Sequence, residues 1–232
     1  MDSRLTILPE PLKNFVLGGL DPVADRFVRM GLRPNLLTAI SVFVLLAASA
    51  CYAVAELRWG AVLLLASGVL DLLDGKVARR GGMATQFGAF IDSTMDRLGE
   101  GMLFTGLAVY LIHTSGQRWP VVGLLLCFGT LTASFLVSYT RARAEGLGLD
   151  GRVGIATRAE RLVLLAGPTL FFGAGPHGWL LLGILSFLFV SSVITVLQRI
   201  AAVHRQTHEP HHEAARAPGA TPVVPAAVLK GS

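Results

Sequence analysis

Residues 59–96 read WGAVLLLASGVLDLLDGKVARRGGMATQFGAFIDSTMD, an apolar run, an arginine- and glycine-rich turn and a second helical segment, with two aspartates on each side of the turn. The apolar run is long enough to cross a bilayer, which takes about 20 residues. Similar runs recur along the 232-residue chain, of which 53% is hydrophobic and only 15% is charged. This composition argues against an ordinary soluble domain and indicates an all-α integral membrane protein.

The hydrophobic pattern predicts six transmembrane helices, which we place at residues 35–55, 59–78, 85–112, 119–142, 159–172 and 178–202. Before them, residues 9–30 mix apolar with charged side chains. This mixture is typical of an amphipathic helix at the membrane surface, with a soluble helix or an irregular lead-in as the alternative. We therefore expect a juxtamembrane segment over residues 1–33, a six-helix domain over 34–205 and a disordered tail over 206–232.

Basic residues fall almost entirely on one side of the predicted spans. Seventeen of the 20 lysines and arginines lie at the termini, in the two longer loops or at the adjoining helix ends, whereas the opposite connections hold only Arg58 and Arg118. Because basic residues gather on the cytoplasmic side, both termini and the longer loops are predicted to face the cytoplasm from the cell (inner) membrane. The net charge of +5 is explained by this topology and needs no nucleic-acid partner.

Four aspartates lie near the cytoplasmic ends of the second and third predicted spans: Asp71, Asp74, Asp92 and Asp96. Carboxylates near hydrocarbon are costly unless they are paired or bind metal, which makes them functional candidates. A spacing of three or four residues places each pair on one helix face, and the short connection allows the two faces to meet. Ligand sets made only of oxygen suit Mg²⁺ or Mn²⁺, and four carboxylates are enough for two ions.

Small residues share these helix faces. Gly75 follows Asp74, while Ala78 and Gly88 each stand four residues from an aspartate. They would leave a slot beside the metals for a flat base or a ribose, although close helix packing could explain each of them singly. Arg79 adds a guanidinium fork, which matches the geometry of a phosphate.

Together these residues form one spaced motif, Asp71-x2-Asp74-Gly75-x2-Ala78-Arg79-x8-Gly88-x3-Asp92-x3-Asp96. The motif resembles the signature of the CDP-alcohol phosphotransferase family at every specified position. The resemblance implies a six-helix membrane enzyme, usually homodimeric, that joins an alcohol to a CMP-activated phosphate at the cytoplasmic side. It implies that the four aspartates hold the metals and that Asp96 is the general base. It also implies a CDP-lipid site made of Pro34, Asn35, Leu36, Gly75, Ala78, Arg79, Thr85 and Gly88.

Four further stretches bear on the acceptor alcohol. FGAFIDSTMDR (87–97), SYTRARAE (138–145), RAERL (158–162) and VITVLQR (193–199) resemble the branch of the family that uses inositol phosphate. The resemblance implies that the acceptor phosphate is bound by Ser138, Arg141, Arg158 and Arg199. Arg141 replaces a lysine of the bacterial enzymes, and Thr157 and Ala159 replace a glutamate and a proline. We expect transfer of a phosphatidyl group from CDP-diacylglycerol to inositol 1-phosphate, with release of CMP.

Other functions are alternatives at this point. Within the family, glycerol 3-phosphate or free inositol could be the acceptor. A transporter or proton relay would also place acids within spans, but it would not need the small-residue slot. Two further expectations concern single residues. Arg97 and Glu100, three residues apart, are expected to form a buried ion pair, and Arg158→Ala is expected to weaken acceptor saturation while leaving metal dependence unchanged.

Overall fold

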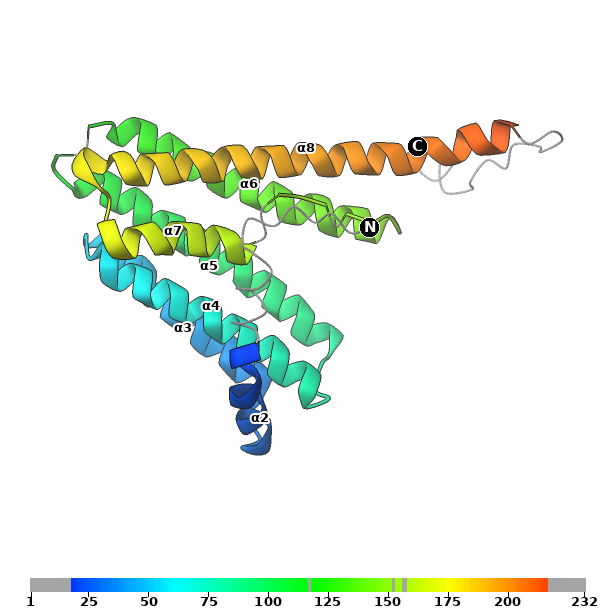
Figure 1. The fold of residues 1–232 in the computed structure, drawn as a ribbon, viewed down its shortest axis with the longest axis horizontal. Coiled ribbons are helices and arrows are strands. Elements are labelled where there is room, and N and C mark those ends of the chain that lie inside the picture. The colour runs from blue at the N-terminus through cyan, green and yellow to red at the C-terminus, as the bar shows by residue number, and fades with distance from the viewer. Residues whose placement is uncertain (1–17, 117, 152, 156–157, 217–232) are drawn as a thin grey trace, which may run out of the picture.

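The fold is a bundle of helices joined mostly by short turns (Figure 1). This computed structural model describes residues 18–116, 118–151, 153–155 and 158–216, and within those ranges it contains no β-strand. The elements are α2 (Asp21–Arg29), α3 (Pro34–Ala53), α4 (Leu57–Arg80), α5 (Gln86–His113), α6 (Pro120–Gly146), α7 (Arg158–Phe172), the 3₁₀ turn η1 (Pro176–Gly178) and α8 (Trp179–Arg216). Each of the six segments predicted to span the membrane is thus a helix.

Local sequence signals explain several helix ends. α3 and α6 begin at Pro34 and Pro120, where a missing N–H breaks no hydrogen bond and the fixed φ suits a helix. α5 begins after Thr85, whose hydroxyl accepts a hydrogen bond from the backbone N–H of Gly88 at 3.0 Å. The turn between α4 and α5 uses Gly82 at φ +63°, a conformation that other residues rarely adopt. These features make the tight connection that brings the two aspartate-bearing helices together.

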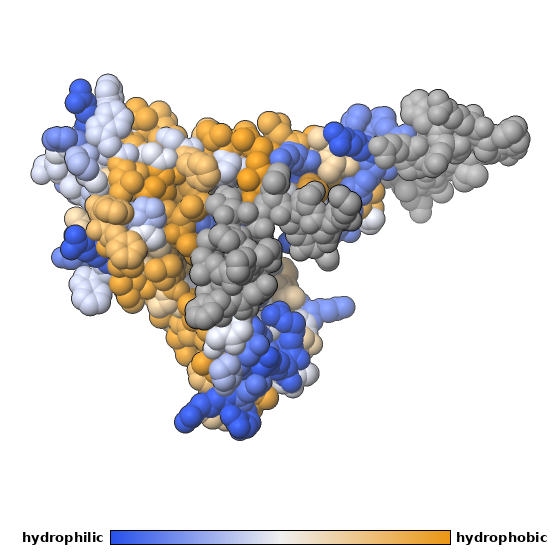
Figure 2. All heavy atoms as spheres, viewed as in Figure 1, coloured by the Kyte–Doolittle hydropathy of each residue, from blue (hydrophilic) through white to orange (hydrophobic). Residues whose placement is uncertain are grey.

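Within the described residues, three helices are long and apolar enough to cross a membrane by length and composition: Pro34–Ala53, Pro120–Gly146 and Pro176–His208. Figure 2 shows hydrophobic side chains over the middle of the molecule and hydrophilic ones at its extremities. A hydrophobic middle between hydrophilic ends is the arrangement expected of a membrane protein. The all-helical class is therefore confirmed for the described residues, and three of their helices could cross a membrane.

α8 is longer than the sequence predicted. It continues to Arg216, so residues 206–216 are helical where the sequence predicted the start of a disordered tail. Once the packed apolar part of a helix has formed, each further residue adds a hydrogen bond without a new nucleation cost, which favours extension into polar sequence. Residues 217–232 lie outside the described residues.

The helices pack around one apolar core. α3 packs against both α4 and α5, α7 packs against α4, and α6 packs against α5 and α8. Most of these helices contribute buried leucines to the core, among them Leu45, Leu64, Leu107, Leu165 and Leu185. Burying such a side chain contributes about 1.5–3 kcal/mol relative to exposure in water. Lipid is as apolar as a leucine side chain, so between helices that cross a membrane the stability comes mainly from close packing.

The two ends of the bundle differ. At one end lie the turns that follow α3, α5 and α7, and the backbone N–H of Arg118 donates to the carbonyl of His177 at 3.3 Å. At the opposite end lie α2, the α4–α5 turn and the far end of α8 (Figure 1). The aspartate motif belongs to this second end, on the side for which the sequence predicted most of the basic residues.

α2 is attached to α4 through charge and apolar contact. Lys76 and Arg80 of α4 both pair with Asp21, and Ala24 is buried in a small apolar cluster with residues of α3 and α4. The hydrogen bond from Lys76, together with the charge of Arg80, lowers the pKa of Asp21 below its usual value. The predicted surface helix corresponds in part to α2, and its residues 9–17 lie outside the described residues.

A buried polar cluster joins α5, α6 and α7. The Oε1 atom of Glu100 accepts a hydrogen bond from the Ser134 hydroxyl at 2.6 Å and lies 3.2 Å from Nη2 of Arg161, which also donates to Ser134 at 2.7 Å. All three residues are almost fully buried. The expected Arg97–Glu100 pair is therefore wrong: Glu100 turns inward to Arg161, while Arg97 contacts Asp96 and the Ser93 carbonyl.

Removing one charge from this cluster should strongly destabilise the bundle. We expect Arg161→Met to lower the free energy of unfolding by about 3–5 kcal/mol, because Glu100 is left buried and unpaired. Unfolding by SDS titration in mixed micelles measures this. Arg143→Met, an exposed arginine of α6, is the matched control and should change little. The double variant Glu100→Met/Arg161→Met should be less destabilised than Arg161→Met alone, and equal or greater destabilisation would contradict a paired contribution.

Candidate active site

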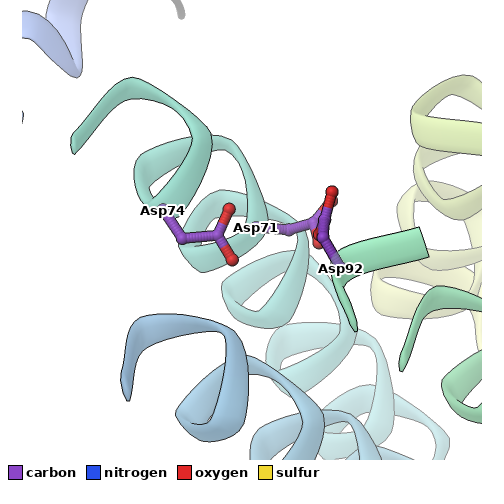
Figure 3. Close-up of side chains that lie close together, drawn as sticks. All are labelled: Asp71, Asp74 and Asp92. Carbon is purple, nitrogen blue, oxygen red and sulfur yellow. The ribbon is translucent and has the colours of Figure 1, made fainter. Parts of the chain in front are cut away.

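Three carboxylates converge between α4 and α5. One oxygen from each of Asp71, Asp74 and Asp92 lies within 4.8 Å of the others. Figure 3 shows Asp71 and Asp74 on adjoining turns of α4, with the Asp92 carboxylate beside that of Asp71. Asp74 is buried, and the other two are half-buried. The structure thus brings together three of the four aspartates that the sequence placed on two facing helix surfaces.

A hydroxyl from a third helix orients one of these carboxylates. The Oγ1 atom of Thr38 in α3 donates to Oδ2 of Asp74 at 2.7 Å, and both side chains are buried. A fixed second partner leaves the other Asp74 oxygen directed at the cluster, as is typical of residues that support metal ligands. Sequence reasoning missed Thr38. The available signal was its position four residues after Pro34, on the same helical face as that predicted site residue.

The fourth aspartate, Asp96, has a different partner. Its Oδ1 atom lies 2.7 Å from Nη1 of Arg158, at the start of α7, and the same nitrogen lies 3.1 Å from Oδ2 of Asp71. Arg97 contacts the other Asp96 oxygen at 3.6 Å. Arg158 therefore bridges Asp71 and Asp96, and Asp96 is not part of the group of three converging carboxylates.

A cavity of about 170 Å³ adjoins the carboxylates where the start of α3 meets the end of α4 and the start of α5. Asp74 and Asp92 form part of its wall. Seven of the eight residues predicted to bind a CDP-lipid also line it: Pro34, Asn35, Gly75, Ala78, Arg79, Thr85 and Gly88. The eighth, Leu36, is exposed and is not among the lining residues.

The two motif glycines keep this cavity open. A Cβ atom added to Gly75 would lie 3.2 Å from Nη1 of Arg79, so the absent side chain lets the guanidinium fold back toward the cavity. A Cβ atom added to Gly88 would lie 3.1 Å from the Thr85 hydroxyl and 3.8 Å from Oδ1 of Asn35. The contacts at 3.2 and 3.1 Å would be tighter than most van der Waals contacts, so a side chain at either position would force Arg79 or Thr85 to shift.

A second, larger cavity of about 790 Å³ lies between α5 and α6. Asp92 belongs to the wall of both cavities, so the converging carboxylates stand between them. Asp96 lines the second cavity, together with Ser138 and Arg141 from α6, two of the predicted acceptor-phosphate residues. The Nε atom of Arg141 also donates to Glu145 at 3.0 Å, on the exposed part of α6.

The other two predicted acceptor residues lie elsewhere in the site. Arg158 forms ion pairs with Asp71 and Asp96 and is not among the residues that line the larger cavity. Arg199 of α8 donates from Nε to the Val153 carbonyl at 2.8 Å and from Nη1 to the Val137 carbonyl. It thus ties the loop after α6 to α6 and α8. A role for Arg199 in acceptor binding stays a prediction.

The donor set fits a hard divalent cation. The three converging residues offer only carboxylate oxygens, the ligands that Mg²⁺ and Mn²⁺ prefer, and Asp74 has the second partner, Thr38, that such a ligand needs. The residues that would hold the ion are Asp71, Asp74 and Asp92. Three anions so close together repel one another strongly in a half-buried site, and a cation would relieve that repulsion.

Comparison with known proteins agrees with this chemistry. The sequence profile of the CDP-alcohol phosphatidyltransferase family matches residues 31–197. The chain is 41% identical over 184 residues to the archaetidylinositol phosphate synthase of Methanothermobacter thermautotrophicus, covering 79% of this chain and 88% of that protein. It is 38% identical over 203 residues to the phosphatidylinositol phosphate synthase of Mycolicibacterium smegmatis, covering 83% and 88% respectively.

Solved structures show the same fold. The phosphatidylinositol phosphate synthase of Mycobacterium tuberculosis with CDP-DAG bound superposes with a TM-score of 0.70 at 30% sequence identity, over 88% of this chain and 96% of that one. The same enzyme in complex with manganese and citrate also gives a TM-score of 0.70, at 31% identity over 88% and 92% of the two chains.

Proposed function

Since the chain belongs to the CDP-alcohol phosphatidyltransferase family, we propose that it transfers the phosphatidyl group of CDP-diacylglycerol to inositol 1-phosphate and releases CMP. One observation carries this assignment. The converging carboxylates stand between a small cavity lined by the CDP-lipid motif and a larger one lined by Ser138 and Arg141. A donor and an acceptor bound in these two cavities would meet at the carboxylates.

The donor half of the site suits a nucleotide diphosphate. The small cavity offers a slot beside Gly75 and Gly88, the guanidinium of Arg79 for a phosphate, and the amide of Asn35 for a base or ribose. The relative with CDP-DAG bound supports the diacylglycerol donor. Divalent ions held by the aspartates, one or two in number, would neutralise the charge that develops on the diphosphate.

The acceptor half supplies the base. Asp96 lines the larger cavity, so its carboxylate can take the proton from the acceptor hydroxyl as that oxygen attacks the β-phosphorus. Arg141 and Ser138 would hold the phosphate of the acceptor, with Arg158 and Arg199 as the further predicted partners. Because a carboxylate is a weak base, most of the acceleration comes from holding donor and acceptor in line.

The membrane setting completes the proposal. Six helices, α3 to α8, cross the cell (inner) membrane, with α2 at its surface and with the aspartate end of the bundle facing the cytoplasm. The excess of basic residues at that end supports this orientation. The domain extends over residues 34–205, and the protein works as a homodimer, as the family resemblance implies.

CMP release from CDP-diacylglycerol tests the function. Purified protein in lipid nanodiscs is given inositol 1-phosphate, free inositol or glycerol 3-phosphate in turn, and the lipid product is identified by mass. We expect inositol 1-phosphate to be preferred over free inositol because only a phosphorylated acceptor brings an anionic group to the arginines of the site. We expect it to be preferred over glycerol 3-phosphate because four stretches of the chain resemble the inositol phosphate branch of the family. Equal rates with free inositol, or a preference for glycerol 3-phosphate, would overturn the acceptor assignment while leaving the family membership intact.

Metal removal should stop the reaction. With excess chelator we expect CMP release to fall to background, because Asp71, Asp74 and Asp92 would then be left without the cation that offsets their charge. Adding back Mg²⁺ or Mn²⁺ should restore activity, whereas Ca²⁺, which is larger and prefers more ligands, should restore less. Full turnover in chelator would contradict the assigned chemistry.

A further inference from the structure

Arg158 is the residue of the site whose contacts differ most from its predicted role. Its Nη1 atom contacts carboxylates from two different helices, Asp71 of α4 at 3.1 Å and Asp96 of α5 at 2.7 Å. Its side chain is only 21% exposed. Its Nε atom is buried and has no hydrogen-bond partner within the part of the chain that the structure describes. The guanidinium therefore has a donor left for a further acceptor.

Because of these contacts, Arg158 would compete with a divalent cation for the carboxylate of Asp71. Asp71 is one of the three converging carboxylates, and a guanidinium on Oδ2 of Asp71 both occupies an oxygen and repels a second positive charge nearby. Asp96 is the predicted base, and the same guanidinium covers its Oδ1 atom. While Arg158 contacts both carboxylates, metal binding by Asp71 is weakened and Asp96 is less available to take a proton.

A phosphate can take Arg158 away from them. A phosphate monoester carries about 1.5–2 negative charges and three acceptor oxygens, so it competes well with a carboxylate for a guanidinium. Asp96 lines the larger cavity, which holds Ser138 and Arg141 on its opposite wall. A phosphate bound there would lie near a guanidinium that already has an unused Nε donor.

We propose that Arg158 is an internal counter-ion that the acceptor phosphate draws off Asp71 and Asp96, so that acceptor binding and metal binding strengthen each other. The proposal rests on the proposed function, because it needs a phosphorylated acceptor. It gives a physical reason for the expected preference over free inositol: without a phosphate, Arg158 stays on the carboxylates. It also replaces the expectation that Arg158 variants leave metal dependence unchanged. By linkage, the factor by which acceptor tightens metal binding equals the factor by which metal tightens acceptor binding.

The test is a binding measurement that does not depend on turnover. Full-length protein in nanodiscs is titrated with Mn²⁺, and free Mn²⁺ is read from its electron paramagnetic resonance signal, which also accounts for chelation by the added phosphate. The variants are Arg158→Gln, which removes the charge and keeps a similar shape, and Arg143→Gln, which removes an exposed charge from the same end of the bundle. Each is titrated alone, with inositol 1-phosphate and with free inositol. Thermal unfolding checks that each variant folds, and Arg158→Lys is the substitute if Arg158→Gln does not.

Only the Arg158 variant is expected to change the affinity for Mn²⁺. Arg158→Gln should bind Mn²⁺ about tenfold tighter than wild type, because a competing cation is gone, while Arg143→Gln should stay close to wild type. Inositol 1-phosphate should tighten Mn²⁺ binding about tenfold in wild type and much less in Arg158→Gln, and free inositol should have no effect in either. Arg158→Lys keeps the charge but loses the fork, so its affinity for Mn²⁺ should lie between that of wild type and that of Arg158→Gln.

Two results would overturn the proposal. The first is Mn²⁺ affinity in Arg158→Gln that equals or falls below that of wild type. The second is an effect of inositol 1-phosphate that is absent in wild type or equally large in Arg158→Gln. The CMP-release assay separates this failure from failure of the proposed function. If inositol 1-phosphate supports turnover without changing Mn²⁺ affinity, the counter-ion role alone is wrong. If it supports no turnover, the acceptor itself is wrong.

Discussion

Asp96→Asn should lower turnover by about 10²- to 10⁴-fold, the range that general-base catalysis contributes, while binding of the CDP-lipid persists. The amide of asparagine keeps the shape of the side chain and can still accept a hydrogen bond from Arg158, but it cannot take a proton. Asp96 is outside the small cavity and outside the group of three converging carboxylates, so donor binding does not depend on it directly.

Two measurements check this prediction. CMP release gives the turnover number, and equilibrium binding of a fluorescent CDP-lipid gives the donor affinity for the same preparation. Glu56→Gln, an exposed carboxylate at the opposite end of the bundle, is the matched control and should change neither. Turnover within a few-fold of wild type would remove Asp96 from its role, and a parallel loss of donor affinity would show that it acts as a ligand instead.

Asp92→Asn should have an effect as large through a different route. Asp92 is one of the three converging carboxylates and lines both cavities, so its loss removes a metal ligand at the place where donor and acceptor meet. Partners that only orient a ligand contribute about 10- to 100-fold to metal affinity or activity, and a ligand itself should contribute more. We expect weaker Mn²⁺ binding and loss of CMP release together.

Asp92→Asn and Asp96→Asn should respond differently to added Mn²⁺. High Mn²⁺ concentrations should recover part of the activity of Asp92→Asn, since the defect is in metal affinity, and should recover none of the activity of Asp96→Asn. Mn²⁺ titration of CMP release in both variants measures this difference. If Asp92→Asn bound Mn²⁺ as tightly as wild type does, the assignment of Asp92 as a ligand would be contradicted.

The carboxylate cluster and the small cavity could be anticipated from sequence because they depend on local spacing. Asp71 and Asp74 share a face through helical periodicity, and the short turn at Gly82 returns the chain so that Asp92 faces them. The glycine positions follow from the same register. Such features depend on the helical periodicity of two consecutive helices and on the short turn between them, both of which can be read from the sequence.

Two ion-pair contacts of α7 that the sequence did not reveal join helices distant along the chain. The Arg158 bridge reaches 87 residues back to Asp71, and the Arg161–Glu100 pair spans 61 residues. Nothing in the local pattern says how α7 lies against α4 and α5, so Arg97 was the only partner that spacing offered to Glu100. The orientation of α7 is set by packing of the whole bundle, which periodicity does not determine.

The central claim to test is that α4 and α5 hold a divalent metal next to a CDP-lipid bound in the small cavity where α3, α4 and α5 meet. Anomalous diffraction at the manganese edge tests it most directly, from crystals of the full chain grown with Mn²⁺ and CDP-diacylglycerol. We predict an anomalous peak among Asp71, Asp74 and Asp92, with the nucleotide beside Gly75 and Arg79. Manganese found only away from these three carboxylates, with the nucleotide outside that cavity, would contradict the claim.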